Sequence, residues 1–285
     1  MTEAVLPFSK MHGGGNDFVI VNAVHRLLPA LDFRHLAARR DGVGCDQILI
    51  LQAPKTPAAD FEYRIINADG GEVGQCGNGA RCAHVFAQRQ GLTDKKCLRL
   101  QTSHTVITTT GVGDGIVRAE LAVPQFAPAN IPLLCDKQND TYTADNVIDA
   151  GRFAALSLGN PHAVFFVSDE TAAAVREIGF AFNRAHELFP VGVNVGFCRV
   201  IDACTLALRV YERGVGETPS CGSGAVAAAV AAMQAGFVHT PVQVCMRGVE
   251  LRCGWEGASS PAWLEGPITH VFDGVIPLSN VQVEA

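Results

Sequence analysis

The sequence predicts an α+β protein built from two related halves, each strand-rich with one main helix. Two observations indicate this fold class. A repeat relates residues about 145 positions apart, and each copy runs from an alternating strand through a polar loop into a helix that ends at glycine. At 285 residues the chain is also long enough for two domains of typical size.

The repeat is clearest around two cysteines. Gln75-Cys-Gly-Asn-Gly-Ala-Arg-Cys-Ala83 matches Ser220-Cys-Gly-Ser-Gly-Ala-Val-Ala-Ala228, and the cysteines lie 221 − 76 = 145 residues apart. The same offset gives four further pairs: Arg64 with Arg209, Asn67 with Glu212, Glu72 with Glu217, and Gly91 with Gly236. Gly15 to Phe18 matches Gly159 to His162 with an offset of 160 − 16 = 144. A tandem duplication with one single-residue insertion or deletion explains both offsets.

The elements of each half follow in the same order. Short strands are predicted at Val19 to Val21 and Phe61 to Ile66 in the first half, and at Ala163 to Val167 and Leu206 to Tyr211 in the second. The helices are predicted at 78–89 and 223–234, where Asn78 and Ser223 are suitable N-cap residues. Each cysteine therefore falls just before the first turn of its helix.

The rest of the chain predicts mainly strands and turns. Two strands, 105–110 and 116–121, are joined by a glycine-rich turn, and one amphipathic helix is expected near 171–178. Prolines at 124, 128 and 132 interrupt any periodic pattern, which makes this stretch the best candidate for a linker. We therefore predict one half over 1–127 and the other over 128–275.

Composition excludes several classes. The formal net charge is -6 and no long run of Lys or Arg occurs, so neither a nucleic-acid surface nor an anionic membrane surface is predicted. The N-terminal residues do not have the pattern of a signal peptide, and a cytoplasmic protein is expected. Ten scattered cysteines without a C-x-x-C pair predict free thiols. Seven of them are expected to be structural: Cys45, Cys97, Cys135, Cys198, Cys204, Cys245 and Cys253.

Paired cysteines at helix starts indicate a specific chemistry. A helix N-terminus lowers the pKa of a nearby thiol and binds carboxylates, because its N–H groups are unpaired and its dipole is positive there. If the two halves face each other, Cys76 and Cys221 would approach one α-carbon from opposite sides, as a two-base racemase requires. Glycines beside the cysteines, at 77, 79, 222 and 224, would let the backbone approach a bound carboxylate closely.

Long motifs across nearly the whole chain resemble those of the diaminopimelate epimerase family. They include Met11-His-Gly-Gly-Gly-Asn-Asp-Phe18, Asn67-Ala-Asp-Gly70, Gly159-Asn-Pro-His162, Tyr211-Glu-Arg-Gly214 and the two cysteine motifs. The resemblance implies interconversion of LL- and meso-diaminopimelate on the lysine and peptidoglycan route, without a cofactor or a metal. It also implies two similar domains, each a mostly antiparallel strand layer around a central helix. The tail 276–285 would return to the first domain, and the chain would form a homodimer.

The resemblance further implies roles for individual residues. Cys76 and Cys221 would be the acid/base pair, with Cys76 taking the proton from the LL isomer. Backbone groups of Gly77, Asn78, Gly222 and Ser223 would hold the reacting carboxylate, and His162 and Glu212 would support the reacting amino group. The remaining substrate contacts would come from Asn16, Gln47, Asn67, Asn160, Asn194 and Arg213, with Arg213 at the distal carboxylate. Gly14, Cys45 and Ala163 depart from the family pattern.

Other readings stay open beside this one. A proline or hydroxyproline epimerase would also use paired cysteines, and a two-lobed solute-binding protein would need none. A pyridoxal-phosphate racemase is disfavoured because none of the five lysines lies in a site-like motif. Redox or zinc chemistry at Cys82 and His84 is disfavoured by their spacing from Cys76. His162 could instead be a core histidine bonded to the backbone.

Overall fold

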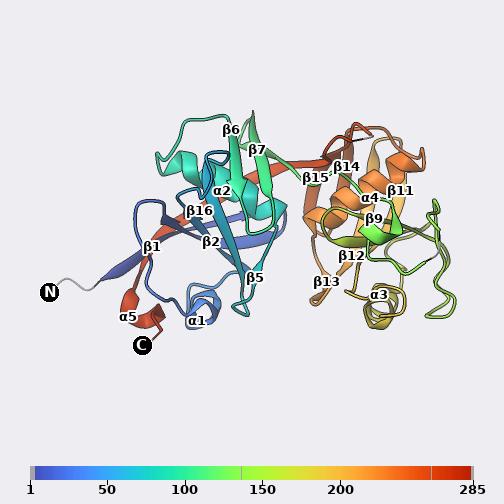
Figure 1. The fold of residues 1–285 in the computed structure, drawn as a ribbon, viewed down its shortest axis with the longest axis horizontal. Coiled ribbons are helices and arrows are strands. Elements are labelled where there is room, and N and C mark those ends of the chain that lie inside the picture. Colours follow the sequence, from blue (N-terminus) through green and yellow to red (C-terminus); the bar gives the residue numbers. More distant parts are fainter. Residues whose placement is uncertain (1–3, 136, 258, 284–285) are drawn as a thin grey trace. The chain divides into compact units, whose positions relative to one another are not determined.

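The chain folds into two compact units. The computed structural model describes residues 4–135, 137–257 and 259–283. One unit comprises Met1–Ala119 and Gly266–Ala285, and the other Glu120–Glu265 (Figure 1). The return to the first unit thus begins earlier than the predicted tail at 276. The predicted linker lies inside the second unit, where Gln125 pairs with Ser157 and Ile131 is buried, because prolines interrupt periodic structure without preventing packing.

The first unit is a ring of strands around one helix. Its elements are β1 (Val5–Gly13), β2 (Asn16–Ala23), α1 (Phe33–Ala37), β3 (Gln47–Gln52), β4 (Phe61–Asn67), β5 (Glu72–Val73), α2 (Gly77–Arg89), β6 (Cys97–Gln101), β7 (Val106–Gly113), β8 (Ile116–Glu120), most of β16 (Trp263–Pro277) and α5 (Leu278–Val281). The strand order is β1-β2-β3-β4-β6-β7-β8-β16, and β16 pairs again with β1. This last pairing closes the sheet into a barrel.

The second unit repeats this arrangement. Its elements are η1 (Pro128–Asn130), β9 (Phe153–Ser157), β10 (Pro161–Phe166), α3 (Val175–Arg184), β11 (Asn194–Asp202), β12 (Thr205–Glu212), β13 (Gly216–Thr218), α4 (Gly222–Gln234), β14 (Val242–Met246), β15 (Val249–Gly254) and the start of β16. The strand order is β9-β10-β11-β12-β14-β15-β16. Residues 121–125 close this ring, since Leu121 bonds to Ala262 and Gln125 bonds to Ser157.

The two units share one strand topology, as the sequence repeat predicts. β2 and β3 run parallel, as do β10 and β11, and the parallel pair β4–β6 corresponds to β12–β14. The neighbouring pairs are antiparallel in both units, including the short strands β5 and β13 beside β4 and β12. The predicted fold class, two pseudo-symmetric halves that each wrap a mostly antiparallel layer around a helix, is therefore confirmed.

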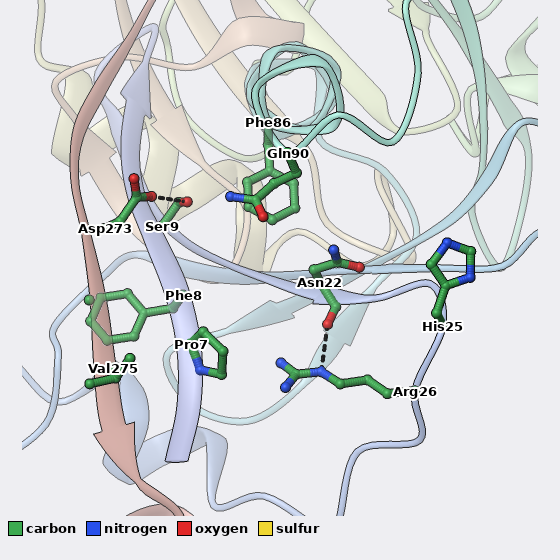
Figure 2. Close-up of a pocket in the computed structure, with 11 residues that line it drawn as sticks. Pro7, Phe8, Ser9, Asn22, His25, Arg26, Phe86, Gln90, Asp273 and Val275 are labelled. Carbon is green, nitrogen blue, oxygen red and sulfur yellow. Dashed lines mark hydrogen bonds between the residues drawn. The ribbon is translucent and has the colours of Figure 1, made fainter.

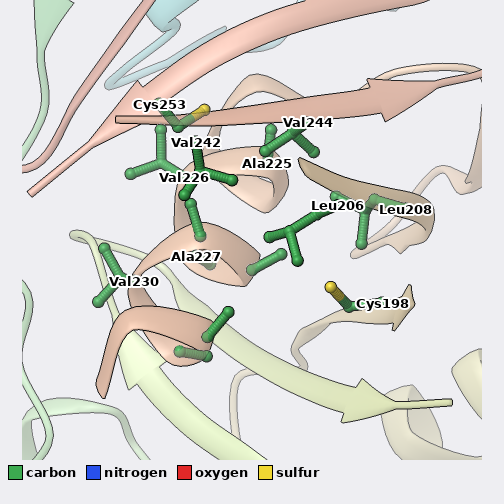
Figure 3. Close-up of a cluster of buried hydrophobic side chains, with 14 of the residues drawn as sticks. Cys198, Leu206, Leu208, Ala225, Val226, Ala227, Val230, Val242, Val244 and Cys253 are labelled. Carbon is green, nitrogen blue, oxygen red and sulfur yellow. The ribbon is translucent and has the colours of Figure 1, made fainter. Parts of the chain in front are cut away.

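Each central helix fills the interior of its barrel. In the second unit α4 is almost entirely Ala, Val and Gly, and its residues 224–232 are buried among Leu206, Leu208, Val242 and Val244 (Figure 3). Alanine favours the helix and its small side chain lets strands approach from every side. In the first unit Ala80, Ala83 and Ala87 of α2 pack in the same way, beside the larger Phe86.

Both central helices end as predicted, and a third helix begins later than predicted. Gly91 and Gly236 follow α2 and α4 with φ of 67° and 74°, the left-handed conformation that glycine adopts without steric cost. The helix expected near 171–178 is α3, which begins only at Val175. The reason is a local turn: Asp169 Oδ1 accepts hydrogen bonds from the backbone N–H and the hydroxyl of Thr171, at 2.8 and 2.6 Å.

The C-terminal segment packs within the first unit. β16 pairs with β1 from Gly13↔Ile268 to Val5↔Pro277. Beyond this strand, the Leu278 N–H donates to the Ala4 carbonyl at 2.8 Å, and the Asp32 N–H donates to the Val281 carbonyl at 2.7 Å. The end of the chain thus contributes a strand and a helix to the domain that holds Cys76.

Candidate active site

Cys76 is the N-cap of α2. Its backbone is extended, with φ -151° and ψ 107°, and its Sγ accepts a hydrogen bond from the Gly79 N–H at 3.3 Å. The predicted N-cap, Asn78, is wrong, because the sulfur takes the place that a Ser or Asp oxygen usually occupies. The N–H groups of Gly77 and Asn78 belong to the first turn, where an α-helix has no internal acceptor for them. Cys76 therefore lies where an anion is stabilised.

Cys221 caps α4 in the same way. Its φ and ψ are -139° and 114°, and its Sγ accepts from the Gly224 N–H at 3.4 Å. The predicted cap, Ser223, instead has its Oγ 3.7 Å from the sulfur. Burial, and next the Glu212 carboxylate, raise the pKa of Cys221 well above its ordinary value. This direction is opposite to the lowering expected at a helix start, because burial outweighs the helix N–H groups, and it favours the thiol form of Cys221.

Four predicted substrate residues of the first half form two hydrogen-bonded pairs. Asn78 Nδ2 donates to Asn16 Oδ1 at 2.8 Å, and Gln47 Nε2 donates to Asn67 Oδ1 at 2.9 Å. Gln47 and Asn67 lie directly opposite each other on β3 and β4. Asn16 begins β2, which runs alongside β3. The starts of β2 and β3, the end of β4 and the start of α2 therefore bring polar side chains to one end of this barrel.

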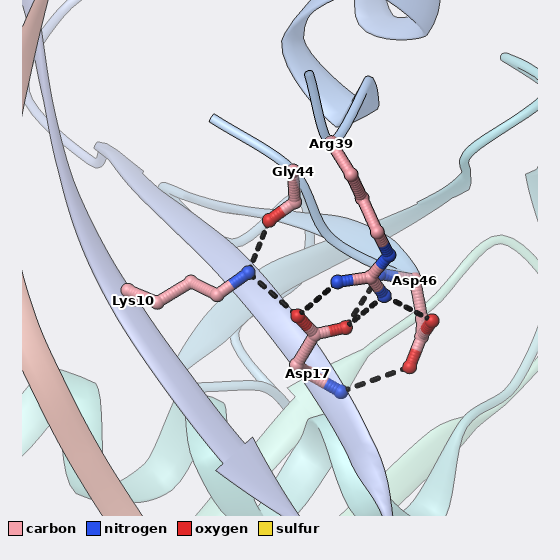
Figure 4. A network of polar contacts seen from close by, with 5 residues as sticks. All are labelled: Lys10, Asp17, Arg39, Gly44 and Asp46. Atoms are coloured by element: carbon pink, nitrogen blue, oxygen red, sulfur yellow. Dashed lines mark hydrogen bonds and ion pairs between the residues drawn. The ribbon is translucent and has the colours of Figure 1, made fainter. Parts of the chain in front are cut away.

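An ionic cluster ties these two strand starts together. The carboxylates of Asp17 and Asp46 each accept the other residue's backbone N–H, at 2.9 and 3.1 Å, and Arg39 donates to both carboxylates at 2.6 to 2.9 Å (Figure 4). Lys10 Nζ lies 2.7 Å from Asp17 and also contacts the Gly44 carbonyl. Because Asp17 follows Asn16 and Asp46 precedes Gln47, this cluster holds the backbone beside two candidate ligand residues.

Asp17 makes the stability of this cluster depend on pH. Burial opposes ionisation of Asp17, but hydrogen bonds from Arg39 and Lys10 outweigh it and lower its pKa below the ordinary carboxyl range. A depressed folded-state pKa adds stability above about pH 4 that is lost as pH falls through the folded-state value. We expect Asp17→Asn to lower the free energy of unfolding by about 1–2 kcal/mol at pH 7 and by progressively less below about pH 4. Urea unfolding across this range measures the difference.

The control for this prediction is Asp41→Asn. Asp41 is an exposed carboxylate close in sequence to Arg39. Its replacement should leave the unfolding free energy within about 0.5 kcal/mol of wild type at every pH. A penalty for Asp17→Asn that does not change between pH 7 and pH 3 would contradict the ionic explanation.

The predicted residues of the second half form a separate group around Cys221. His162 Nε2 lies 3.1 Å from Asn160 Oδ1, and Asn160 Nδ2 donates to Ser223 Oγ at 3.4 Å. Asn194 Oδ1 accepts from the Arg213 backbone N–H at 2.9 Å. These bonds link residues of β10, β11 and the end of β12 to the start of α4.

His162 and Glu212, the two residues predicted to support the reacting amino group, also have defined surroundings. Burial, and next the positive charge of Arg213, lower the pKa of His162 to about 3, so its imidazole is neutral at pH 7. Because Asn160 presents its oxygen, His162 must carry its proton on Nε2. The Thr218 hydroxyl donates to Glu212 Oε1 at 2.5 Å. Thr218 is therefore a second-half residue that the sequence analysis missed.

A pocket of about 590 Å³ adjoins this group within the second unit. Its lining includes Arg213, Gly159 and Pro161, together with Gln125 and Ser157. Arg213 Nη1 donates to the Val191 carbonyl at 3.1 Å, which holds the guanidinium at the pocket wall. The predicted distal-carboxylate ligand thus faces a cavity of ligand size.

Of the seven cysteines that we predict to be structural, Cys45, Cys198 and Cys253 are buried and Cys245 is partly buried, whereas Cys97, Cys135 and Cys204 are exposed. Cys82 is fully buried on α2, and burial raises its pKa above the ordinary range. Burial also raises the pKa of the Cys45 thiol to about 11. His84 Nδ1 bonds to Thr109 Oγ1 at 2.9 Å, inside the barrel. Within residues 4–135, 137–257 and 259–283, no group of three or more His, Cys, Asp or Glu side chains could hold a metal ion.

The fold is shared with solved enzymes of low sequence identity. A hydroxyproline epimerase from Agrobacterium vitis superposes with a TM-score of 0.67 at 14% identity, covering 96% of this chain and 93% of that one. A methylitaconate-delta-isomerase gives 0.67 at 12% identity, covering 100% and 99%. No helix among the described residues is long and apolar enough to cross a membrane.

Each unit is a ring of strands around a helix capped by cysteine, and the curated relatives of this chain place it among the isomerases that act as epimerases. The diaminopimelate epimerase family model matches residues 8–122 and 154–271. The chain belongs to the diaminopimelate epimerase family. A diaminopimelate epimerase of Nitrosospira multiformis is 45% identical over 275 residues, 96% of this chain and 99% of that relative. One from an Azoarcus species is 45% identical over 274 residues, with 95% and 98% covered.

Proposed function

We propose that this chain interconverts LL-2,6-diaminopimelate and meso-diaminopimelate, a step of lysine and peptidoglycan precursor biosynthesis. The observation that carries the proposal is the pair of cysteines that cap repeat-related helices, within a chain that aligns end to end with diaminopimelate epimerases. Each cap places a sulfur beside backbone N–H groups that suit a carboxylate.

The proposed reaction is a proton exchange at one α-carbon. The Cys76 thiolate removes the α-proton of the LL isomer, and the electron pair of the broken C–H bond spreads into the adjacent carboxylate. Backbone N–H groups of Gly77, Asn78, Gly222 and Ser223 stabilise that charge. The Cys221 thiol then delivers its proton to the opposite face, which forms the meso isomer and leaves Cys221 as the thiolate. The raised pKa of Cys221 supports its role as the proton donor in this direction.

Polar side chains complete the proposed substrate contacts. A neutral His162 and the Glu212 carboxylate support the reacting amino group, and Arg213 binds the distal carboxylate through its planar fork. Asn16, Gln47, Asn67, Asn160 and Asn194 supply further hydrogen bonds. The distal carboxylate distinguishes a diamino diacid from a small cyclic amino acid, for which Arg213 would have no partner.

The test is isotope exchange in solution. The reduced protein is incubated with LL-diaminopimelate in deuterated water, without added pyridoxal phosphate or metal, and NMR follows the α-proton signal and the meso product. Loss of one α-proton with formation of the meso isomer is expected. Exchange of proline or hydroxyproline instead would keep the mechanism and change the substrate. No exchange with any amino acid would favour a binding protein.

We further propose that the chain acts as a homodimer through the exposed apolar side chains of β16. Val271, Phe272 and Val275 are 52%, 45% and 63% exposed, and Phe272 packs edge-on against Phe8 of β1. Phe8 and Val275 also line a pocket of about 700 Å³ whose wall includes Phe86 and Gln90, at the end of α2 away from Cys76 (Figure 2). A second copy that covers these side chains would leave the cysteine end of the barrel open.

Phe272→Glu is expected to shift the chain from dimer to monomer, because a carboxylate cannot be buried unpaired in an apolar interface. Sedimentation equilibrium measures the change. Phe180→Glu is the matched control, since Phe180 is 56% exposed on α3 and contacts Arg184. If both variants remain dimers, the interface lies elsewhere.

A further inference from the structure

Arg81 lies in an unusual place for a cation. It is fully buried on α2, 81 − 76 = 5 residues after the cysteine cap. Charged side chains are almost never fully buried without polar partners, so the hydrogen bonds of Arg81 decide how it is accommodated.

Hydrogen bonds connect Arg81 to a candidate substrate residue. Arg81 Nη2 donates to Asn78 Oδ1 at 2.7 Å. Asn78 is 2% exposed, and its Nδ2 donates to Asn16 Oδ1 at 2.8 Å and to the Gly14 carbonyl at 3.1 Å. This relay, Arg81 to Asn78 to Asn16, lies wholly within the first unit.

The chemistry of the end groups fixes the direction of the relay. A guanidinium has only donors and a backbone carbonyl only accepts. Asn78 must therefore turn its oxygen to Arg81 and its amide nitrogen to Gly14 and Asn16. Asn16 in turn must accept through Oδ1, which directs its own N–H₂ group away from Asn78. An amide that presents N–H donors suits a carboxylate ligand, whereas its oxygen would repel one.

The second half shows that the fold does not require this chain of hydrogen bonds. The position 81 + 145 = 226 is occupied by Val226, which is also fully buried. In that half Asn160 corresponds to Asn16 and Ser223 corresponds to Asn78. Asn160 donates a hydrogen bond to Ser223, whereas Asn16 accepts one from Asn78. Two related helices thus pack in the same way with a cation in one and an apolar side chain in the other, and their relays run in opposite directions.

We propose that Arg81 is a positioning residue that fixes Asn78, and through it Asn16, so that the first half-site presents N–H donors to a substrate carboxylate. The inference rests on the proposed function, because it assigns the ligand of Asn16. Without a donor-only group at position 81, only the Gly14 carbonyl still orients the Asn78 amide, so Asn78 and Asn16 hold this orientation less firmly.

The test compares Arg81→Gln, Arg81→Lys and Asn16→Ala, alone and combined, by KM and kcat for diaminopimelate. Gln keeps a long side chain but can either donate or accept, so we expect KM to rise about tenfold with a smaller change in kcat. Lys remains a donor only and should keep KM within a few-fold of wild type. Adding Arg81→Gln to Asn16→Ala should raise KM no further, because both changes remove one relay. Val226→Ala is the matched control and should act independently of Asn16→Ala.

Circular dichroism and thermal melting first establish that each variant is folded. If Arg81→Gln does not fold, Arg81→Met replaces it in the same cycle. A KM for Arg81→Lys as high as that for Arg81→Gln overturns the inference, as does a double variant whose KM rise equals the product of the single effects. A wild-type chain that does not turn over diaminopimelate overturns the proposed function itself, which is a different result.

Discussion

Replacing Cys76 or Cys221 with serine is expected to lower the rate of epimerisation by about 10²- to 10⁴-fold, the range that a positioned acid or base contributes. A serine hydroxyl keeps the size and can still accept the cap hydrogen bond from Gly79 or Gly224. It cannot serve as the base, because its proton is held far more tightly than that of a thiol. The defect should therefore appear in turnover and not in folding.

The two variants should also differ from each other. With LL-diaminopimelate in deuterated water, Cys76→Ser removes the base of the proposed mechanism and should abolish α-proton exchange. Cys221→Ser leaves that base in place but removes the donor, so slow exchange without meso product is expected. NMR resolves both signals in one sample.

The control for these variants is Cys97→Ser. Cys97 is an exposed thiol on β6, in the same unit as Cys76. Its replacement should leave kcat and KM unchanged. If Cys76→Ser or Cys221→Ser retains turnover within tenfold of wild type while remaining folded, the two-base assignment is wrong.

The local pattern of the sequence was sufficient to predict much of this fold. The offset of 145 residues places α2 and α4 in register, and both helices run over matching ranges, 77–89 and 222–234. Alternation predicts β4 and β12 to within a residue or two. Helix and strand positions of this kind depend on residues that are neighbours along the chain, and the repeat shows each pattern in two copies.

Features that depend on distant residues were not predictable in the same way. In the ionic cluster, Asp17 and Asp46 join two strands although they are 29 residues apart in the chain. The Tyr63 hydroxyl likewise donates a hydrogen bond to the Cys76 carbonyl, 13 residues away. The raised pKa of Cys221 arises from burial, which follows from the closure of the whole barrel. Helix-start preferences pointed to Asn78 and Ser223 as caps, because statistics favour oxygen acceptors over sulfur.

Gly79 offers the second large expected effect, because it lies between the cap sulfur and a buried tyrosine. A Cβ at position 79 would lie 2.2 Å from the Tyr63 hydroxyl and 3.3 Å from side-chain atoms of Leu49 and Phe18. Tyr63 is 1% exposed, so its ring cannot move aside into solvent. Gly79→Ala should therefore cost about 1–3 kcal/mol of stability through overpacking.

Gly79→Ala should also lower kcat, since it displaces the cap that positions the Cys76 sulfur. A displacement near 1 Å can reduce turnover by about 10²-fold. Gly224→Ala is the matched change in the second half. Its Cβ would lie 3.1 Å from Val210 and 3.3 Å from the Cys221 sulfur, tight contacts that require shifts of only a few tenths of an ångström. A smaller loss of stability is expected there, measured by urea unfolding beside steady-state kinetics.

The double variant Gly79→Ala with Tyr63→Phe separates the steric explanation from a loss of glycine flexibility. Phenylalanine removes the oxygen that the new methyl group would strike, so the pair should recover part of the stability and turnover lost by Gly79→Ala alone. Glycine is not needed at this position for its backbone conformation, because residue 79 lies inside α2, where alanine is the better helix former. No recovery in the double variant would mean that the constraint at position 79 comes from the backbone of the cap and not from Tyr63.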